Sequence, residues 1–562
     1  SATATGNFYG ILSSGTNTNT GSLWKLYGNE VYGNSRMQSI LGAGPSYGIH
    51  NSSSGLTVSI YSNNVYSNSW PSTSSAYGIY LSSSAPDSLL VETNEVHDIT
   101  KPNAVSMTTL KSGALYGIYI SNTKANAKTH IRSNNVYNLT NSWGGQAMGY
   151  RGDAGTTGTV NVYSNTAYNI SSDDQAIFGI YNGAGLTNNI YNNRLYNLNA
   201  AVGDSACFYG ISTGSTTAAS VTSVYNNYVS DLKTLQADVY LSAALYMFGS
   251  TAGTTHQYYN NTVYLNNLPN AGNPVTAAVF AGTVPNLDMR NNILVNNSTV
   301  FGTGATISFW REDASAATYL AGSNHNCFHA GTPGVNNLIY YDGTNVALTI
   351  TEYQALFPQE SQSFTELPPF TDITTAPYDL HLLTNVATSC ESYATVISSP
   401  AITTDYDGQA RFPNPGYPDN PSYPATAPDV GADEFGGIPN FTCTTPVPGN
   451  TLTSANGICL GSSVALSMQN PTPGTGVTYQ WQRSPDDVTY SDISGAVYMG
   501  YTAIPTVPTY YKCKVTCQNG PSSAYSNSLQ ITFANAITST TPGTRCGTGT
   551  VSLAAAAGSG TI

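Results

Sequence analysis

The sequence predicts an all-β protein in which a right-handed parallel β-helix of about ten or more coils precedes an immunoglobulin-like β-sandwich. Three observations support this: an asparagine-led motif at regular intervals, a second motif between its copies, and a change of pattern near residue 438. We therefore expect four parts in the 562 residues: helix coils (1–330), irregular last coils with a cap (331–437), an Ig-like domain (438–535) and the truncated start of a second such module (536–562).

The first motif begins with Asn and has an apolar residue two positions later, usually followed by an aromatic residue. It occurs nine times, at intervals of 28 to 40 residues. Because side chains alternate along a strand, the apolar residue would point inward and the aromatic one outward. Asn tolerates left-handed backbone at a corner, and its amide can bond to the amide one coil above. The expected ladder consists of Asn29, Asn63, Asn94, Asn134, Asn165, Asn193, Asn227, Asn261 and Asn292.

The second motif, aromatic-Gly-Ile, occurs six times, first at Tyr9-Gly10-Ile11. Each repeat thus has at least two short β-type runs, and such runs must stack to bury their apolar faces. Helical solenoids need helix-forming residues and helical periodicity, and propeller blades need four antiparallel strands. Stacked coils fit better than either. A short helix is expected only at residues 349–357, after the regular repeats.

Composition narrows the class of partner. Charged residues make up 8% of the chain, with 17 Lys and Arg against 30 Asp and Glu, and no basic run occurs. Nucleic acid binding needs clustered basic residues, so we exclude it. No apolar stretch is long enough to span a membrane, and no signal peptide or cofactor motif is present. We expect a mature or partial segment of a longer extracellular or cell-surface protein.

The eight cysteines indicate disulfides and an oxidising compartment. Cys513 and Cys517 would share one face of a strand, so each could pair with Cys443 or Cys459. These four cysteines allow three pairings, and the sequence does not choose among them. A further pair could form between Cys327 and Cys390.

The end of the first part carries a family resemblance. It contains Asp405-Tyr406-Asp407-Gly408, Arg411 and the run Asp429-Val430-Gly431-Ala432-Asp433-Glu434-Phe435. This resembles the closing segment of secreted bacterial right-handed β-helix proteins of the pectate-lyase-like superfamily. These often end in Asp-Gly-x-x-Arg followed by a PD(I/V)GA(D/Y)E(F/Y) signature. The resemblance implies that the helix extends to about Phe435.

The C-terminal module has short strands at regular spacing, a central Trp481 and a late strand rich in Tyr and Cys at 510–517, as in an Ig-like sandwich. It resembles the Ig-like repeats of large bacterial surface proteins exported by the type IX secretion machinery. The resemblance rests on residues 479–482, 493–496 and 510–517. Tandem modules of this kind would form a stalk.

The pectate-lyase-like superfamily includes polysaccharide lyases and glycosidases, which use paired carboxylates, or a basic residue beside calcium. The acidic pairs of this chain are Asp173-Asp174 and Glu312-Asp313. Members of each pair are adjacent, so they would face opposite sides of a strand or lie in turns. Solvated turn residues are the simpler interpretation.

Two further groups are candidates for binding. His325, Cys327 and His329 alternate in sequence and would share one strand face, as metal ligands can, although a fourth ligand is missing. Otherwise His325 would occupy the ladder position and Cys327 the inward one. The outward tyrosines would either stack against sugar rings or stabilise neighbouring coils. They are Tyr66, Tyr137, Tyr168, Tyr196 and Tyr264.

We therefore expect a non-enzymatic extracellular or cell-surface protein, either an adhesin or a structural surface component. Surface glycans or other cell-surface proteins would be its partners. A secreted polysaccharide lyase or glycoside hydrolase with accessory Ig-like modules is the alternative, resting on fold analogy. A subunit of an extracellular filament is a third. No catalytic residue, metal or cofactor is assigned.

Overall fold

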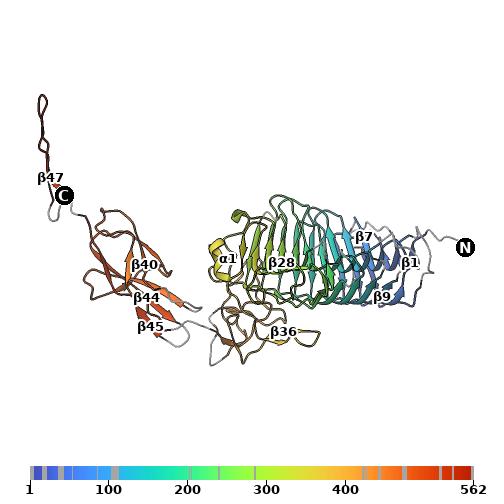
Figure 1. Cartoon of the computed structure of the whole chain (residues 1–562). Coiled ribbons are helices and arrows are strands. Elements are labelled where there is room, and N and C mark those ends of the chain that lie inside the picture. The colour runs from blue at the N-terminus through green and yellow to red at the C-terminus, as the bar shows by residue number, and fades with distance from the viewer. Residues whose placement is uncertain are drawn as a thin grey trace. The chain divides into compact units, whose positions relative to one another are not determined.

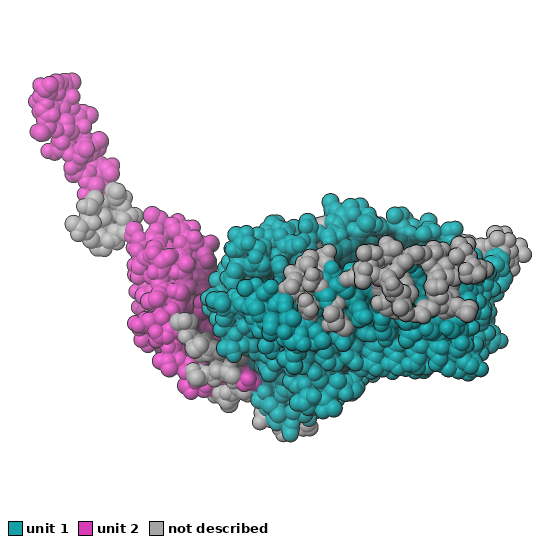
Figure 2. Space-filling view, turned by 45° about the vertical axis from the view of Figure 1, so that its right-hand side comes forward, with its two compact units in different colours: residues 1–439 teal, residues 440–562 magenta. Residues whose placement is uncertain are grey.

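The computed structural model describes residues 6–15, 22–35, 44–53, 55–84, 86–102, 113–142, 144–200, 203, 205–237, 241–283, 286–420, 425, 427–440, 445–470, 477–517, 522–534 and 537–557. The chain divides into two compact units, residues 1–439 and 440–562 (Figure 2). The first unit is a parallel β-solenoid of about nine turns, close to the ten or more expected (Figure 1). The right-handed sense of the solenoid stays a prediction.

Strands one repeat apart in sequence pair with one another, so the solenoid has three long sheets. Sheet A contains β1(Phe8–Ser13), β4(Ser46–Asn51), β7(Ala76–Ser83), β10(Leu115–Asn122), β13(Ala147–Ala154), β16(Ile177–Asn182), β19(Phe208–Thr213), β24(Ser242–Met247), β28(Val275–Ala281), β31(Ala305–Arg311), β33(Asn337–Tyr341) and β34(Val346–Ala347). Sheet B contains β2(Leu23–Tyr27), β5(Thr57–Tyr61), β8(Ser88–Glu92), β11(Lys128–Arg132), β14(Thr159–Tyr163), β17(Thr187–Tyr191), β20(Val221–Tyr225), β25(Thr255–Tyr259) and β29(Leu287–Arg290). Sheet C contains β3(Glu30–Tyr32), β6(Asn64–Ser69), β9(Glu95–Lys101), β12(Asn135–Asn141), β15(Thr166–Ser172), β18(Arg194–Ala200), β21(Tyr228–Ser230), β22(Leu232–Thr234), β26(Thr262–Leu265), β30(Ile293–Asn296) and β32(Cys327–His329).

The asparagine-led motif forms the strands of sheet C. Its apolar residues lie in one register line, in which Val65 pairs with Val96 and Val96 with Val136. All three are fully buried, whereas Tyr66 and Tyr137 lie half-buried on the outer face. The alternation read from the sequence is therefore confirmed.

The aromatic-Gly-Ile motif lies on sheet A, where its glycines allow the inner faces of two sheets to approach closely. A Cβ atom on Gly48 would lie 2.5 Å from Cγ1 of Val65 and 2.6 Å from the carbonyl oxygen of Gly78. Ile49, the next residue, is fully buried. A larger residue at this position would push sheet A away from sheet C, which explains the recurrence of glycine.

The asparagine ladder is present throughout. Nδ2 of Asn63 donates to Oδ1 of Asn94 at 2.9 Å, and the equivalent bond joins every successive pair from Asn29 to Asn326 at 2.8 to 3.1 Å. We expected the left-handed backbone at the ladder residue itself. It lies one residue earlier. Ser62 and Ser164, for example, both have a φ of 53°.

The solenoid ends at α1 (Ile350–Leu356), which lies across its last turn (Figure 1). Thr349 caps this helix and forms a capping box with Glu352, so the helix expected at 349–357 is confirmed. The remaining small elements of this unit are the 3-10 helices η1 (Ala316–Thr318) and η2 (Pro358–Glu360) and the strands β23(Gln236–Ala237), β27(Ala271–Gly272), β35(Phe370–Asp372), β36(Asp379–Leu382), β37(Ala387–Thr388) and β38(Ile438–Pro439).

The described residues of 370–435 form a cap that packs on sheet C, and the closing signature lies inside it. Arg411 is 2% exposed and donates to Oε2 of Glu434 at 3.0 Å and to the carbonyl oxygen of Gly431 at 2.7 Å. It also donates to Oδ1 of Asn226, in the turn that precedes β21, at 3.2 Å. The signature residues Arg411 and Glu434 therefore anchor the cap to the solenoid.

The second unit contains two antiparallel sheets that share one apolar core. Trp481 is fully buried in that core, beside Val464 and Val515. One sheet consists of β39(Thr451–Thr453), β40(Val464–Met468) and β43(Tyr501–Ala503). The other consists of β41(Val477–Ser484), β42(Ser491–Asp492), β44(Thr509–Cys517), β45(Ser522–Tyr525) and β46(Leu529–Ile531). A hairpin of β47(Ile537–Thr541) and β48(Ala554–Ala557) follows.

The cysteines give little support for the expected disulfides. Free thiols are present at Cys207, Cys327, Cys390, Cys459, Cys513 and Cys546. Cys459 and Cys513 are therefore unpaired, against expectation. Cys327 of β32 and Cys390 of the cap are unpaired too, although their thiols are neighbours. Cys517 is not among the free thiols, and Cys443 lies outside the described residues. Across the described part of the chain, no helix has both the length and the apolar character needed to cross a membrane.

Candidate functional site

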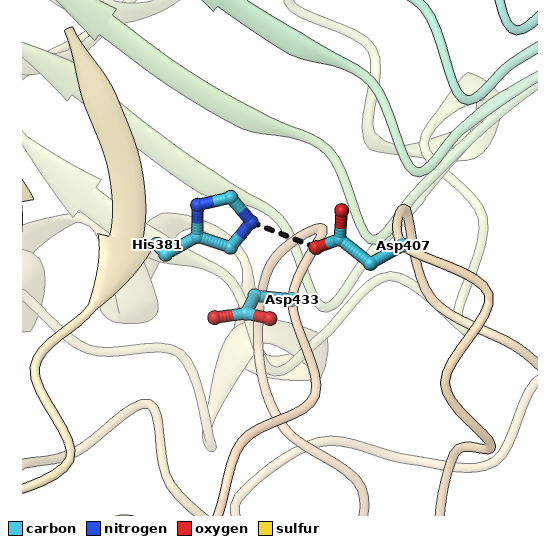
Figure 3. Close-up of side chains that lie close together, drawn as sticks. All are labelled: His381, Asp407 and Asp433. Carbon is cyan, nitrogen blue, oxygen red and sulfur yellow. Dashed lines mark hydrogen bonds and ion pairs between the residues drawn. The ribbon is translucent and has the colours of Figure 1, made fainter.

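Three side chains from separate segments of the cap converge on one point. His381 comes from β36, Asp407 from the turn after Asp405, and Asp433 from the closing run (Figure 3). One nitrogen of His381 and one carboxylate oxygen of each aspartate lie within 4.8 Å of one another. We call these three residues the cap triad; it is the one group with metal-ligand geometry among the described residues.

Hydrogen bonds orient the histidine at both nitrogens. Nδ1 of His381 lies 2.5 Å from Oδ1 of Asp379, and Nε2 lies 2.7 Å from Oδ2 of Asp407. Asp433 is 7% exposed, and its Oδ2 accepts a bond from the backbone nitrogen of Leu382 at 3.4 Å. The ring is thus fixed between two carboxylates, with a third, buried carboxylate beside it.

The electrostatics follow from burial and close charges. Burial raises the pKa of Asp433 to about 6. The negative charges of Asp405 and Asp407 add to this increase, whereas the positive charge of His381 opposes it. Burial acts to lower the pKa of His381, but the hydrogen bond that its ring donates to Asp379 and the charges of Asp433 and Asp407 outweigh burial and raise the pKa. The cap triad therefore favours a positive charge at its centre.

Sheet C provides the other side of the site. Tyr228 of β21 is 4% exposed, and its ring meets the His381 ring edge-on at a centroid distance of 5.3 Å. Its hydroxyl has no hydrogen-bond partner among the described residues. Burial, together with the charges of Asp433, Asp407 and Asp405, holds the Tyr228 pKa well above its usual value.

The space beside the cap triad is small. A cavity of about 20 Å³ is lined by Tyr228, Asp379, His381 and Tyr406, and also by Arg194 from β18. This volume holds roughly one water molecule or a small ion. It is far too small for a sugar ring, so a polysaccharide chain would have to bind outside it.

The two acidic pairs that were weighed as catalytic candidates are not brought together. Asp173 and Asp174 lie in the turn before β16, and Glu312 and Asp313 follow β31, four strands along sheet A. At about 4.8 Å per strand this separates the pairs by roughly 19 Å along the axis, beyond the 6.5–9.5 Å that an inverting glycosidase needs. Both oxygens of Asp313 accept bonds within its own turn, from Ser315 and Thr318.

The candidate metal group, for which no metal was assigned, was placed one residue out of register. Asn326, not His325, occupies the ladder position, and Phe328, not Cys327, points into the solenoid core. Nδ1 of His325 contacts the carbonyl oxygen of Tyr393 at 2.7 Å. Cys327 lies under the cap and His329 lines a different pocket, so among the described residues these three form no metal-ligand group.

The tyrosine column on sheet C is a stack. Rings of Tyr32, Tyr66, His97, Tyr137, Tyr168 and Tyr196 follow one another with centroid distances of 4.5 to 5.2 Å and interplanar angles of at most 12°. Such spacing covers the ring faces with neighbouring rings, so the ring edges meet solvent. Stacking on sugar rings would therefore require the column to open.

Tyr264 differs from the other tyrosines of that group. It is 3% exposed and packs edge-on against Phe370 and Tyr378 of the cap. Ser230 takes the column position in the coil before it and pairs with Tyr264. The expectation that Tyr264 points to solvent is therefore wrong, because the cap covers this part of sheet C.

Sequence reasoning did not identify the cap triad. Its members are 26 residues apart in sequence, within irregular segments that have no period. The signal available was the closing signature, which contains Asp407 and Asp433. Tyr228 carried no signal, because its partner segment lies more than 150 residues later in the chain.

Comparison with known protein families finds a match to part of the second unit. Residues 448–535 match a family described as a domain of unknown function (DUF8696). No curated protein and no solved structure matches the chain.

Proposed function

We propose that this chain is a non-enzymatic extracellular or cell-surface protein, an adhesin or structural surface component that displays its β-solenoid on Ig-like modules. The proposal rests on one observation, made on the outer face of sheet C. A regular column of stacked rings occupies it, and the acidic pairs weighed as catalytic candidates do not meet there. The few charged residues, 8% of the chain, leave a surface hydrated by hydroxyl and amide groups.

Several finer features belong to the same proposal. The solenoid would be right-handed and related to the pectate-lyase-like superfamily, on the strength of its closing signature. The second unit would be an Ig-like sandwich of the type IX secretion kind, because Trp481 lies in a core shared by two antiparallel sheets. Residues 448–535, which match DUF8696, fall within this module. We infer an oxidising compartment, in which Cys517, which is not among the free thiols, takes part in a disulfide.

The ligand class we propose is a surface glycan, bound along the edges of the stacked rings. Because the ring faces are covered, recognition would rely on hydrogen bonds from phenol hydroxyls and nearby amides. Tyr137 and Tyr168, at the centre of the column, are half-buried with centroids 4.9 Å apart. Their hydroxyl groups can be removed without removing the rings.

The test uses the labelled full chain on an array of plant, algal and bacterial glycans. We expect a specific subset to bind, and expect the double variant Tyr137→Phe, Tyr168→Phe to weaken that binding at least fivefold at unchanged melting temperature. Tyr191→Phe, in the separate stack on sheet B where Tyr163 and Tyr191 lie 4.7 Å apart, is the matched control. An effect of the control equal to that of the double variant would refute the assignment to sheet C.

A polysaccharide-degrading enzyme remains the second candidate, favoured by one observation: the carboxylates of Asp407 and Asp433 lie close together beside His381. The cavity of about 20 Å³ argues against a sugar site there. The third candidate, a filament subunit, predicts regular fibres in electron micrographs of the purified protein.

A further inference from the structure

We propose that the cap triad binds a divalent transition-metal ion, through Nε2 of His381 and one carboxylate oxygen each of Asp407 and Asp433. The ion would join three segments of the cap that no regular secondary structure holds together. This inference does not depend on the proposed function.

The three donor atoms of the cap triad are close to the spacing that a bound metal ion requires. The three donor atoms lie within 4.8 Å of one another. Tetrahedral ligands at about 2.0–2.2 Å from Zn²⁺ are separated by roughly 3.3 Å. Asp407 is exposed, so rotation of its side chain would bring its carboxylate toward that spacing, while the buried Asp433 would stay in place.

Asp379 supplies the partner that metal-binding histidines have. A histidine ligand usually donates its other ring N–H to a carboxylate, which fixes the tautomer and the ring orientation. Nδ1 of His381 lies 2.5 Å from Oδ1 of Asp379. With the proton on Nδ1, the lone pair of Nε2 points toward Asp407 and the centre of the cap triad.

Tyr228 is an independent indication of a ligand. Buried polar groups are nearly always hydrogen-bonded, and each exception requires an explanation. The Tyr228 hydroxyl is buried and has no partner among the described residues, and its ring packs edge-on against that of His381 beside the same cavity. The adjoining cavity of about 20 Å³ has room for one metal-bound water to which this hydroxyl could bond.

The donor set selects the class of metal. Ca²⁺ and Mg²⁺ take oxygen ligands, whereas imidazole with carboxylates suits Zn²⁺ and its neighbours. The competing arrangement has no metal: a protonated His381 bridges Asp379 and Asp407 as an ion pair. The two arrangements differ in whether Nε2 carries a proton.

The experiment is a calorimetric titration of the chelator-treated full chain at pH 7.5 with ZnCl₂, MnCl₂ and CaCl₂ in separate runs. We expect one Zn²⁺ per chain, a higher melting temperature with Zn²⁺, and weaker or no binding of Ca²⁺. His381→Ala and Asp433→Asn should weaken Zn²⁺ binding at least tenfold, and Asp379→Asn by about 10- to 100-fold. His97→Ala is the matched control, because His97 pairs with Asp98 at 2.7 Å outside any metal-ligand group among the described residues.

Three results would overturn the proposal: no stoichiometric binding of any of these ions, Zn²⁺ binding that survives unchanged in His381→Ala, or binding of Ca²⁺ alone. If His381→Ala fails to fold, Asp407→Asn and the visible spectrum of the Co²⁺-loaded chain replace it. Tetrahedral Co²⁺ bands that are lost in Asp407→Asn support the site. A Co²⁺ spectrum that is identical in the variant and in the native chain refutes it.

Discussion

Asn326 donates its side-chain amide to the carboxyl group of Glu360, at 3.4 Å to Oε1 and 3.3 Å to Oε2. The asparagine ladder, which begins at Asn29, therefore ends on a fully buried acid. Ser363 and Tyr319 also donate hydrogen bonds to this carboxyl group. The ladder and its terminal acid form one continuous polar line through the solenoid.

Glu360 should make stability depend on pH. Burial raises its pKa from an ordinary 4.5 to about 7. The folded chain thus retains a proton that the unfolded chain releases, so this stabilisation is complete below pH 4.5 and is lost as pH rises to 7. The loss amounts to about 3 kcal/mol. Chemical unfolding from pH 4 to 8 should show that Glu360→Gln gains stability relative to the native chain by about this amount. A difference that does not change with pH would contradict the assignment.

The ladder itself should contribute strongly to stability. Asn165 accepts bonds from both the backbone and the side-chain nitrogen of Asn134, so Asn165→Ala leaves buried donors without a partner. We expect a loss of about 3 kcal/mol in the free energy of unfolding. Asn161→Ala, on the outer face of β14, is the control and should cost less than about 0.5 kcal/mol. Equal losses for both variants would show that the ladder is not a special source of stability.

Arg411 should be essential to the cap. Its ion pair with Glu434 is almost fully buried, with side chains 3% and 2% exposed. Removing one partner leaves a buried charge unpaired, which costs about 3–5 kcal/mol. We expect Arg411→Met to expose residues 370–435 to limited proteolysis while the solenoid stays resistant. Arg132→Met, at the half-exposed pair with Glu92 on sheet B, should leave the proteolysis pattern unchanged. A resistant cap in Arg411→Met would contradict this account of the closing signature.

Thiol reactivity should follow burial. Cys459 and Cys546 are exposed, whereas burial raises the pKa of Cys207 to about 11 and that of Cys513 to about 12. The thiolate is the reactive form, so alkylation of the native chain should label the first two and spare the others. Peptide mass spectrometry before and after unfolding measures this. Rapid labelling of Cys207 in the native chain would contradict the packing of the solenoid.

Much of the solenoid could be predicted from the sequence, because each coil repeats the same local constraints. The spacing of the asparagine-led motif alone predicts that Val65 points inward and that Asn63 bonds to Asn94, as the structure shows. The register failed at the last copy, where His325 precedes Asn326. One residue of offset reverses every side chain of a strand, so Cys327 was placed on the wrong face.

The cap triad could not be predicted in the same way. His381, Asp407 and Asp433 meet because the cap folds back onto sheet C, and that path depends on buried contacts such as Arg411 with Asn226. Tyr264 was misplaced for the same reason, since nothing in its own repeat indicates that Phe370 covers it. Long-range packing of an irregular segment has no sequence period that could reveal it.

The most direct test of the central claim is a depolymerisation screen of the full chain. The chain is incubated with the glycans of the binding array, with and without Ca²⁺ and Zn²⁺, and new reducing ends and unsaturated products are measured. If the chain is a non-enzymatic surface protein, no polymer yields products, including the subset of glycans that the chain binds. Turnover of any polymer would contradict the account, and its loss in Asp433→Asn would make the cap triad a catalytic site.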